Sequence, residues 1–537
     1  MKKALVLLMV AAFGLALWSW SGPPRPDVSA SVLNRGLASD PESVDPHKVR
    51  SIQAGTVLRD IGEGLLGYTP TGELVGAAAD HWTISEDGLT YTFHIRESAR
   101  WSNGDPVTAE HFAFSLRRLV DPATAAFYAQ MLSAIVNAEE IIAGEMPPAS
   151  LGVEATDPQT LVIRLRRPTP FLLSLLSVPN TFPVHPGSLA EYGDEFTRPG
   201  KLLSNGAYVL DAWEPGSLLE LSRNEYYWNN AETSIDAVRH HVVTQEMTEL
   251  NRYRAGELQI TANVPPDSFS RVREARPDEL HVAPYLGVYY YGFNLSKPPF
   301  KDNPQLREAL SMAIDREVLV NIIGRGEEPA YSWVPPGVAN YEPRRVSYAD
   351  QTQDERNAHA RRLLHEAGYG PDKPLQIELR YITSDTEQRI ALAVQSMWRD
   401  VLGVETKLIN EEFQVLLANV RAAEITQVFR SSWVGDYNDA HTFLSILEGG
   451  NPANLPGYAS EEYDALMRQA ADQVDPARRR LFLEEAERVL LADHPVMPLY
   501  FYVSKHLVSL DVVGWGDNVL DYHYSQHLSL APDGATP

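Results

Sequence analysis

Residues 89–119 read LTYTFHIRESARWSNGDPVTAEHFAFSLRRL and open with the pattern of a β-strand. The first part, LTYTFHIR (89–96), alternates apolar and polar side chains with a period of two, as a strand with one buried face does. The turn-forming residues SNGDP follow at 102–106. A second alternating segment, LVIRLR, occupies residues 161–166. Both segments predict β-strands.

Helical patterns alternate with these strand patterns along the chain. The pairs Asn303-Pro304 and Asp475-Pro476 each place a capping side chain directly before a proline that suits the first position of a helix. A third helix is predicted for residues 356–367, before a glycine that suits a left-handed C-cap. The apolar stripes of the first two helices consist of Leu306, Ala309, Leu310, Ala313, Ile314 and Val318, and of Leu481, Phe482, Ala486, Val489 and Leu490. The patterns together predict a mixed α/β protein.

Length, composition and charge narrow the class of protein. A chain of 537 residues has room for about three or four domains. With 44% hydrophobic and 22% charged residues, it has the composition of a globular protein with a large core. The net charge of −25 argues against binding to nucleic acid or to an anionic membrane surface. Because there is no cysteine, disulfides, thiolate chemistry and a lipidated N-terminal cysteine are excluded.

The first residues, MKKALVLLMVAAFGLALWSW, have the pattern of an export signal. Two lysines precede an apolar run from Ala4 to Trp18, which is too short for a comfortable membrane span. We expect a signal sequence within residues 1–22, and two outcomes stay open: cleavage near residues 19–22, or retention as an N-terminal anchor. We expect the remainder to lie outside the cytoplasmic membrane, in the periplasm or cell envelope.

Motifs of enzymes are largely missing. The chain has neither a G-x-S-x-G elbow nor an H-E-x-x-H motif, and the glycines in 193–201 are too far apart for a P-loop. The adjacent His240 and His241 would point to opposite faces of a strand, so a structural role is favoured over a shared metal ion. Tyrosine-rich segments at 285–300 and 499–503 suit either half-buried strands or a ligand-contact surface.

The segment SSWVGDYNDAHTF (431–443) poses a similar choice. Asp436 lies beside glycine and asparagine, which is typical of a solvated turn. It also follows an alternating segment, and ligands of α/β proteins bind beyond the carboxyl ends of strands. Local chemistry alone leaves both interpretations open.

Several motifs follow one another in a consistent order from about residue 38 to residue 510. They include SDPESVDPHKV (39–49), EGLLGY (63–68), residues 89–119, NGAYVL (205–210), RNEYYWNN (223–230), NRYRAGEL (251–258), VYYYGFN and REALSMAIDRE (307–317). Together these motifs resemble the extracellular solute-binding proteins of family 5. Within the family, the likeness is greatest to the peptide receptors of ABC importers, including those for murein peptides.

The resemblance implies an α/β fold of the type II periplasmic-binding-protein kind, with two lobes built from three domains. Domain I would comprise residues 28–61, 186–286 and 504–537, domain II residues 62–185, and domain III residues 287–503. In the family, hinge closure encloses a peptide between the lobes. The peptide pairs its backbone with strands of the receptor, and its side chains enter hydrated pockets.

The resemblance also implies a set of ligand-contact residues. In the family, a W-x-x-D-Y-N pattern supplies the carboxylate that meets the α-ammonium group of the peptide, and it falls here on Trp433 and Asp436. Arg430 matches an arginine able to meet the carboxylate end of a short peptide. The other candidate contacts are Tyr128, Tyr502, Phe413 (in place of a tryptophan), Tyr290, Ser432, Ile52, Arg421 and Glu387 (in place of a histidine).

The sequence departs from the family pattern at further positions near this site. Gly292 replaces a ligand-facing glutamate, and Arg50 stands where the family has an acid. Gly287 and Val434 occupy the positions of a cysteine pair. These changes redistribute charge around the cleft, so ligand preference need not follow that of the family.

We therefore expect a monomeric receptor that binds peptide and hands it to a membrane-embedded ABC permease with ATPase subunits. It would use no cofactor, metal ion or catalytic residue. A receptor of the same family for murein tripeptide, nickel or another small solute is the alternative within binding proteins. An envelope hydrolase or a chaperone-like protein is the alternative from another class.

Overall fold

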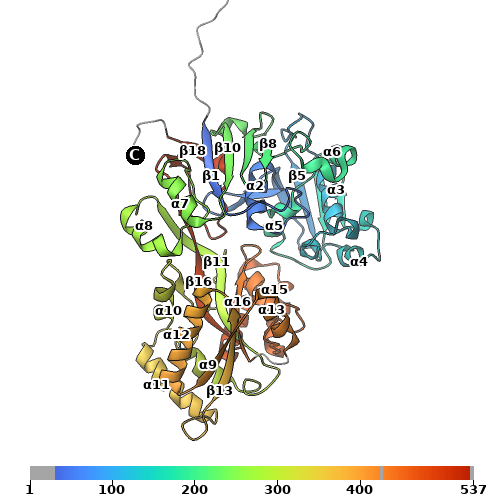
Figure 1. Ribbon diagram of the computed structural model, residues 1–537. Coiled ribbons are helices and arrows are strands. Elements are labelled where there is room, and N and C mark those ends of the chain that lie inside the picture. The colour runs from blue at the N-terminus through green and yellow to red at the C-terminus, as the bar shows by residue number, and fades with distance from the viewer. Residues whose placement is uncertain (1–30, 424–426, 532–537) are drawn as a thin grey trace, which may run out of the picture.

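The computed structural model describes residues 31–423 and 427–531, which form two lobes joined by a pair of long strands (Figure 1). The first lobe holds two four-stranded sheets, and the second lobe holds one six-stranded sheet. The predicted signal segment, residues 1–22, lies outside the described residues. No helix in the described part of the chain is long and apolar enough to cross a membrane.

One sheet of the first lobe has the order β1-β10-β9-β8, with β1 parallel to β10 and the other neighbours antiparallel. Its strands are β1 (Val32–Leu37), β8 (Tyr208–Glu214), β9 (Leu218–Arg223) and β10 (Ala237–Val242). Helix α2 (Ile52–Ile61) begins at the N-cap Ser51 and shares a buried apolar core with this sheet. The helices α7 (Glu246–Arg254) and α8 (Phe269–Ala275) follow β10.

The two histidines of β10 face different partners. The His240 ring is buried, and its Nε2 lies 2.9 Å from Asp60 Oδ2. The His241 Nε2 lies 2.9 Å from Asn34 Oδ1. As strand alternation predicts, the two rings do not converge on one site, and both have structural partners.

The second sheet of this lobe contains the two strands predicted from alternation. Its order is β4-β5-β7-β6, with all neighbours antiparallel. Tyr91, Phe93 and Ile95 of β5 are buried and pack with the adjacent helix, so the predicted buried face is confirmed. The elements of this region are β2 (Leu66–Tyr68), β3 (Leu74–Gly76), β4 (Ala79–Ile84), β5 (Thr90–Ile95), α3 (Ala109–Val120), α4 (Ala138–Ile142), β6 (Val153–Ala155), β7 (Thr160–Arg164), α5 (Leu172–Leu175) and α6 (Pro186–Tyr192).

The sheet of the second lobe has the order β12-β16-β11-β15-β13-β14. Its strands are β11 (Leu280–Phe293), β12 (Glu328–Pro329), β13 (Gln376–Ile382), β14 (Glu405–Glu411), β15 (Val428–Val434) and β16 (Val496–Leu507). The antiparallel strands β11 and β16 pass from one lobe to the other (Figure 1). Tyr289, Tyr290 and Tyr291 of β11 are all buried, so this tyrosine run is mainly core, consistent with the strand interpretation.

Helices flank this sheet, and they differ from the predicted apolar stripes in two details. The segment after Asn303 forms two helices rather than one, because Asp315 accepts from the Val318 N–H and caps a second helix. Val318 and Leu481, which we expected in apolar stripes, are 42% and 57% exposed. The helices are α9 (Pro304–Met312), α10 (Arg316–Ile323), α11 (Gln353–Glu366), α12 (Asp385–Leu402), α13 (Phe413–Ala422), α14 (His441–Leu444), α15 (Glu461–Ala471) and α16 (Pro476–Asp493).

The end of the chain returns to the first lobe, where β17 (Val512–Val513) pairs with β18 (Ser529–Leu530). The expected domain borders at residues 287 and 504 fall inside the continuous strands β11 and β16. The two lobes are therefore connected through these two long, paired strands. The domain borders themselves stay a prediction.

Candidate ligand-binding cleft

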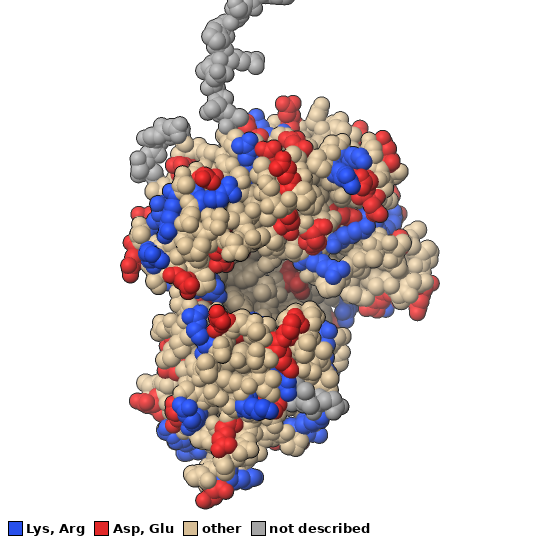
Figure 2. Space-filling view, in the orientation of Figure 1, with Lys and Arg blue, Asp and Glu red and all other residues tan. Residues whose placement is uncertain are grey.

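A deep hollow separates the two lobes in the space-filling view (Figure 2). A cavity of about 360 Å³ lies in this region and is lined by both lobes. The first lobe contributes Ile52 of α2 and Tyr128, and the second lobe contributes residues 434–436 directly after β15. Three of the candidate contacts, Ile52, Tyr128 and Asp436, therefore line one cavity. We refer to it as the cleft cavity.

Asp436 lies in the cleft cavity with no opposite charge at its carboxylate. Its backbone N–H donates to Thr442 Oγ1 at 3.2 Å, which fixes the turn after β15. In the described part of the chain, no Lys, Arg or His nitrogen lies within 4.0 Å of the carboxylate, unlike that of Asp439, which pairs with Arg479 at 2.8 Å. The cavity walls displace part of the water around the carboxylate, and this desolvation raises the pKa of Asp436 to about 6. The side chain remains open to water through the cavity, so it is accessible to a ligand.

The charge of the Asp436 carboxylate raises the pKa of neighbouring tyrosines. Burial is the main cause of the raised pKa of Tyr128, and the charge of Asp436 adds to it. The same two effects act on Tyr522 on the opposite wall. The Arg50 guanidinium, which the family pattern places near the ligand, lies over the ring of Phe127 at 4.7 Å and also lines the cleft cavity. The wall around Asp436 is thus aromatic, with a cation at its rim.

A second cavity of about 220 Å³ lies in the second lobe, and we refer to it as the side pocket. Six of the candidate contacts line it: Tyr290, Phe413, Arg421, Arg430, Ser432 and Trp433. Phe413 is 46% exposed, whereas Tyr290 is nearly buried and packs edge-on against Trp333. The buried indole N–H of Trp433 has no hydrogen-bond partner among the described residues. A buried donor of this kind favours a polar group or a water molecule in the pocket.

The cleft cavity and the side pocket lie along the same strand, and that strand has a free edge. β11 pairs with the whole of β15, but β13 pairs with only its first two residues. Residues Arg430–Val434 therefore have one edge without a strand partner in the described structure. The Gly435 N–H donates to the Leu286 carbonyl at 2.8 Å, so the alternating backbone groups of Ser432 and Val434 face the free edge. An extended chain can pair with these groups.

Arg430 is not a free cation. Its Nε donates to Glu387 Oε1 at 2.9 Å, and its Nη2 lies 3.5 Å from the Tyr502 hydroxyl. The Tyr289 hydroxyl donates to the other oxygen of Glu387. The side chains of Arg430 and Glu387 are only 13% and 10% exposed. Glu387 and Tyr502 therefore contact Arg430. Glu387 neutralises the guanidinium group that, by the family pattern, would meet the carboxylate end of a short peptide.

The departures from the family pattern have structural compensations. A Cβ atom at Gly292 would overlap the ring of Phe429, so Phe429 fills the space where a glutamate side chain would begin. Gly287 and Val434 face each other across the β11–β15 ladder, as expected for positions that hold a cysteine pair elsewhere in the family. A Cβ atom at Gly287 would lie 2.7 Å from the Tyr502 ring. Gly292 and Gly287 thus make room for the rings of Phe429 and Tyr502, respectively.

Sequence reasoning missed the part of the cleft cavity formed by the C-terminal segment. Leu520, Asp521 and Tyr522 line this cavity, together with Arg59 and Tyr285. The only signal was the compact run of acidic, aromatic and histidine residues, DYHY, at 521–524. Such a short run carries no periodicity, and its position opposite Asp436 depends on the return of the chain to the first lobe.

Comparisons with known proteins match almost the whole chain. Residues 73–454 match the family described as "Bacterial extracellular solute-binding proteins, family 5 Middle". The periplasmic oligopeptide-binding protein OppA of Escherichia coli is 37% identical over 541 residues, which is 98% of each chain. The periplasmic murein tripeptide binding protein MppA in its unliganded open form has 36% identity and a TM-score of 0.86, covering 94% of this chain and 98% of that one. Haemophilus influenzae OppA in complex with RPPGFSPFR has 34% identity and a TM-score of 0.75, covering 94% and 99%.

Proposed function

Because the chain belongs to family 5 of the bacterial extracellular solute-binding proteins, we propose that it captures oligopeptides in the cleft and delivers them to an ABC-type importer. Its mixed α/β architecture is that of the type II periplasmic peptide-binding proteins. The family members are binding proteins, and the protein catalyses no reaction itself. It acts in the periplasm, where its relatives are found, as a monomer with a membrane-embedded permease and ATPase subunits as partners.

The observation that carries the proposal is the placement of Asp436 at the end of the free edge of β15. An extended peptide pairs its backbone with Ser432 and Val434 as an added strand. Its α-ammonium group then reaches the carboxylate that has no cation within 4.0 Å in the described structure. A peptide side chain enters the side pocket between Trp433 and Phe413. This mode recognises the common backbone of peptides, so it tolerates varied sequences.

Hinge closure completes the binding. The chain superposes better on the unliganded open form of MppA than on the complex of OppA with a peptide, at nearly equal sequence identity. Both this difference and the open hollow between the lobes support an open state that closes on the ligand (Figure 2). The paired strands β11 and β16, which pass between the lobes, would form the hinge. The division into three domains stays a prediction.

The test compares pairs of peptides that differ only in N-terminal acetylation. Acetylation removes the ammonium charge but leaves backbone and side chains intact. We expect acetylated peptides to bind at least about tenfold more weakly by calorimetry, because hydrogen bonds to charged groups contribute roughly 1.5–3 kcal/mol. Equal affinities would contradict the role of Asp436.

A murein peptide is the second candidate ligand, because the open form of the murein tripeptide binding protein MppA superposes with the TM-score of 0.86. Native mass spectrometry of the purified protein identifies any co-purified ligand by mass and separates the two candidates. Incubation with peptides followed by mass spectrometry tests for catalysis, and cleavage products would contradict a receptor without enzymatic activity.

A further inference from the structure

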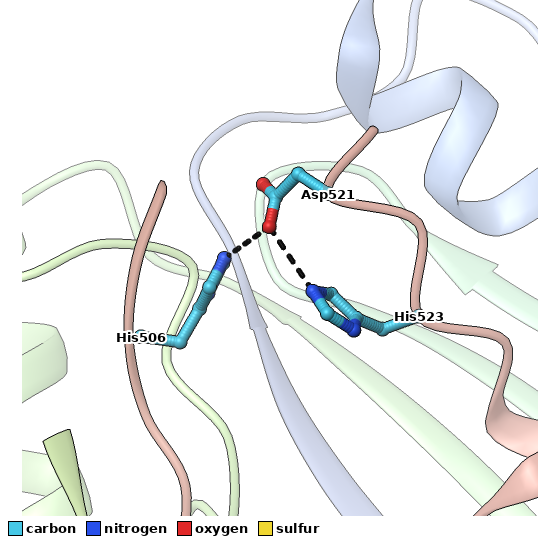
Figure 3. Close-up of side chains that lie close together, drawn as sticks. All are labelled: His506, Asp521 and His523. Atoms are coloured by element: carbon cyan, nitrogen blue, oxygen red, sulfur yellow. Dashed lines mark hydrogen bonds and ion pairs between the residues drawn. The ribbon is translucent and has the colours of Figure 1, made fainter. Parts of the chain in front are cut away.

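Two histidines and an aspartate from the C-terminal part of the chain converge beside the cleft (Figure 3). His506 lies near the end of β16, while Asp521 and His523 lie in the segment that follows β17. One ligand atom from each of the three side chains lies within 4.8 Å of the other two. It is the only such group of three or more potential metal ligands among the described residues. Nothing in the proposed peptide mode uses the two histidines.

The hydrogen bonds of His506 orient its ring toward Asp521. Its Nδ1 lies 2.8 Å from the carbonyl oxygen of Thr261, which can only accept, so Nδ1 carries the proton. The Nε2 lies 2.8 Å from Asp521 Oδ1. In the neutral ring Nε2 has a lone pair, and two acceptor atoms then face each other unless a cation lies between them. Either a proton or a metal ion can occupy this position between Nε2 and Oδ1.

His523 meets the same carboxylate oxygen. Its Nε2 lies 3.1 Å from Asp521 Oδ1, so all three side chains converge on one point. The side chains of His506, Asp521 and His523 are 12%, 25% and 6% exposed, which protects the point from bulk water. Zn²⁺ holds nitrogen and oxygen ligands at roughly 2.0–2.2 Å, which sets neighbouring ligand atoms roughly 3.3 Å apart in a tetrahedron. The two observed distances from a histidine nitrogen to Asp521 Oδ1, 2.8 and 3.1 Å, are slightly shorter than this, and the two histidine nitrogens lie within 4.8 Å of each other. Small shifts of the three side chains therefore reach the tetrahedral spacing.

Neighbouring residues hold the three potential ligand side chains in place, and the nearby positive charge that would repel a metal ion is partly neutralised. The His523 ring stacks on the Trp515 indole with a centroid separation of 3.6 Å, which restricts its rotation. The nearby cation Arg35 donates to the His523 carbonyl oxygen and lies 3.9 Å from Asp60, which offsets its charge. The carbonyl of Thr261 orients His506, as the outer partners of metal-binding histidines do.

We propose that His506 Nε2, Asp521 and His523 Nε2 bind a divalent transition-metal ion of the Zn²⁺, Ni²⁺ or Co²⁺ class. Imidazole and carboxylate ligands suit these ions, and the donor set leaves a further coordination position open. His506, Asp521 and His523 all line a cavity of about 230 Å³, which can hold water at that position. The cavity shares four lining residues with the cleft cavity, namely Ile52, Arg59, Tyr285 and Asp521, so the metal site borders the peptide site without replacing it.

The first experiment titrates the full chain, without a polyhistidine tag, with ZnCl₂ in a calorimeter. We expect one strong site per chain. His523→Gln and His506→Gln each remove a ligand nitrogen and should weaken that site by at least about tenfold, since even the loss of an outer partner costs roughly 10–100-fold in affinity. His94→Gln is the matched control, because His94 stacks on the exposed His81 at 4.2 Å and lies outside the cluster. This variant should retain the strong site.

A second measurement does not depend on the folding of the ligand variants. Co²⁺ and Ni²⁺ have partly filled d shells and quench a nearby indole, and Trp515 stacks directly on His523. Saturable quenching by one equivalent should occur in the wild-type protein and disappear in Trp515→Phe, which should still bind Zn²⁺. The absence of a strong Zn²⁺ site in the wild type would overturn the proposal. If His94→Gln weakened Zn²⁺ binding as much as the ligand variants do, or if quenching were unchanged in Trp515→Phe, the metal would bind elsewhere on the protein. Either result would also overturn the proposal. None of these outcomes bears on peptide binding through Asp436.

Discussion

Replacing Asp436 by asparagine should weaken peptide binding and stabilise the free protein at the same time. The asparagine side chain keeps the shape of aspartate and an accepting oxygen but loses the charge. In the free protein the carboxylate has no cation within 4.0 Å among the described residues, so no internal ion pair is broken by the change. In the complex, the α-ammonium group of the peptide would lose its charged partner.

The expected loss in affinity follows from that one contact. A hydrogen bond between charged groups contributes roughly 1.5–3 kcal/mol. This corresponds to a roughly 10- to 150-fold increase in Kd at pH 7.5. The remaining oxygen of asparagine still accepts a hydrogen bond from the ammonium group, which favours the lower part of this range.

The pH dependence gives the change a second signature. With its pKa at about 6, the Asp436 carboxylate is ionised at pH 7.5 and about nine-tenths protonated at pH 5. Because the ammonium group requires the ionised form, the wild-type Kd should rise about tenfold between pH 7.5 and pH 5. The variant should lack this increase.

The effect on stability has the opposite sign. Because the folded-state pKa is raised from 3.8 to about 6, the stability contributed by protonated Asp436 is present below pH 3.8 and is lost as the pH rises through about 6. Asparagine stays neutral, so the variant should melt slightly higher than the wild type at pH 7.5 and at about the same temperature at pH 4. Water reaches this side chain, so the difference should be small.

Calorimetry with a free-amine peptide and thermal melting at both pH values measure these effects. Asp439→Asn is the matched control in the same loop, since Asp439 accepts from Arg479 Nη1 and Nη2 at 2.8 Å each and lies outside both cavities. It should lower the melting temperature by leaving Arg479 unpaired, while Kd stays within about twofold. Unchanged affinity of Asp436→Asn at pH 7.5, or the same pH dependence in wild type and variant, would rule out the assignment of Asp436 to the peptide ammonium.

Two further predictions concern the side pocket and its neighbours. Glu387→Gln leaves Arg430 without its carboxylate and should destabilise the protein by about 3 kcal/mol in denaturant unfolding, as the loss of one partner of a buried pair does. The same variant should prefer short peptides with a free C-terminal carboxylate over their amidated twins more strongly than the wild type does in calorimetry. An unchanged preference would mean that Arg430 does not face the ligand. Gly292→Ala should lower the melting temperature because its Cβ overlaps the Phe429 ring, and Gly292→Ala combined with Phe429→Leu should recover part of the loss. If the single variant melts like the wild type, the space at Gly292 is larger than the structure indicates.

Much of the local structure could be predicted from the sequence. Period-two alternation located β5 and β7, and capping residues located the starts of α9 and α16, because these features depend on neighbours within a few residues. The prediction of one continuous helix after Asn303 was wrong because the Asp315 cap competes with the apolar periodicity. The family motifs indicated Asp436, whereas its local sequence left a choice between a turn and a site.

The amino-acid sequence was enough to establish the fold class, the family and the position of the W-x-x-D pattern. Which charges are free became visible only in three dimensions: Glu387 neutralises Arg430 from 43 positions away, while Asp436 has no such partner among the described residues. Two other features also became visible only in the tertiary structure. The strand β13 pairs with only two residues of β15, which leaves an edge of β15 free, and His506 and His523 both lie next to Asp521. These features depend on contacts between distant segments, and their geometry is set by how whole strands and lobes pack rather than by any local pattern.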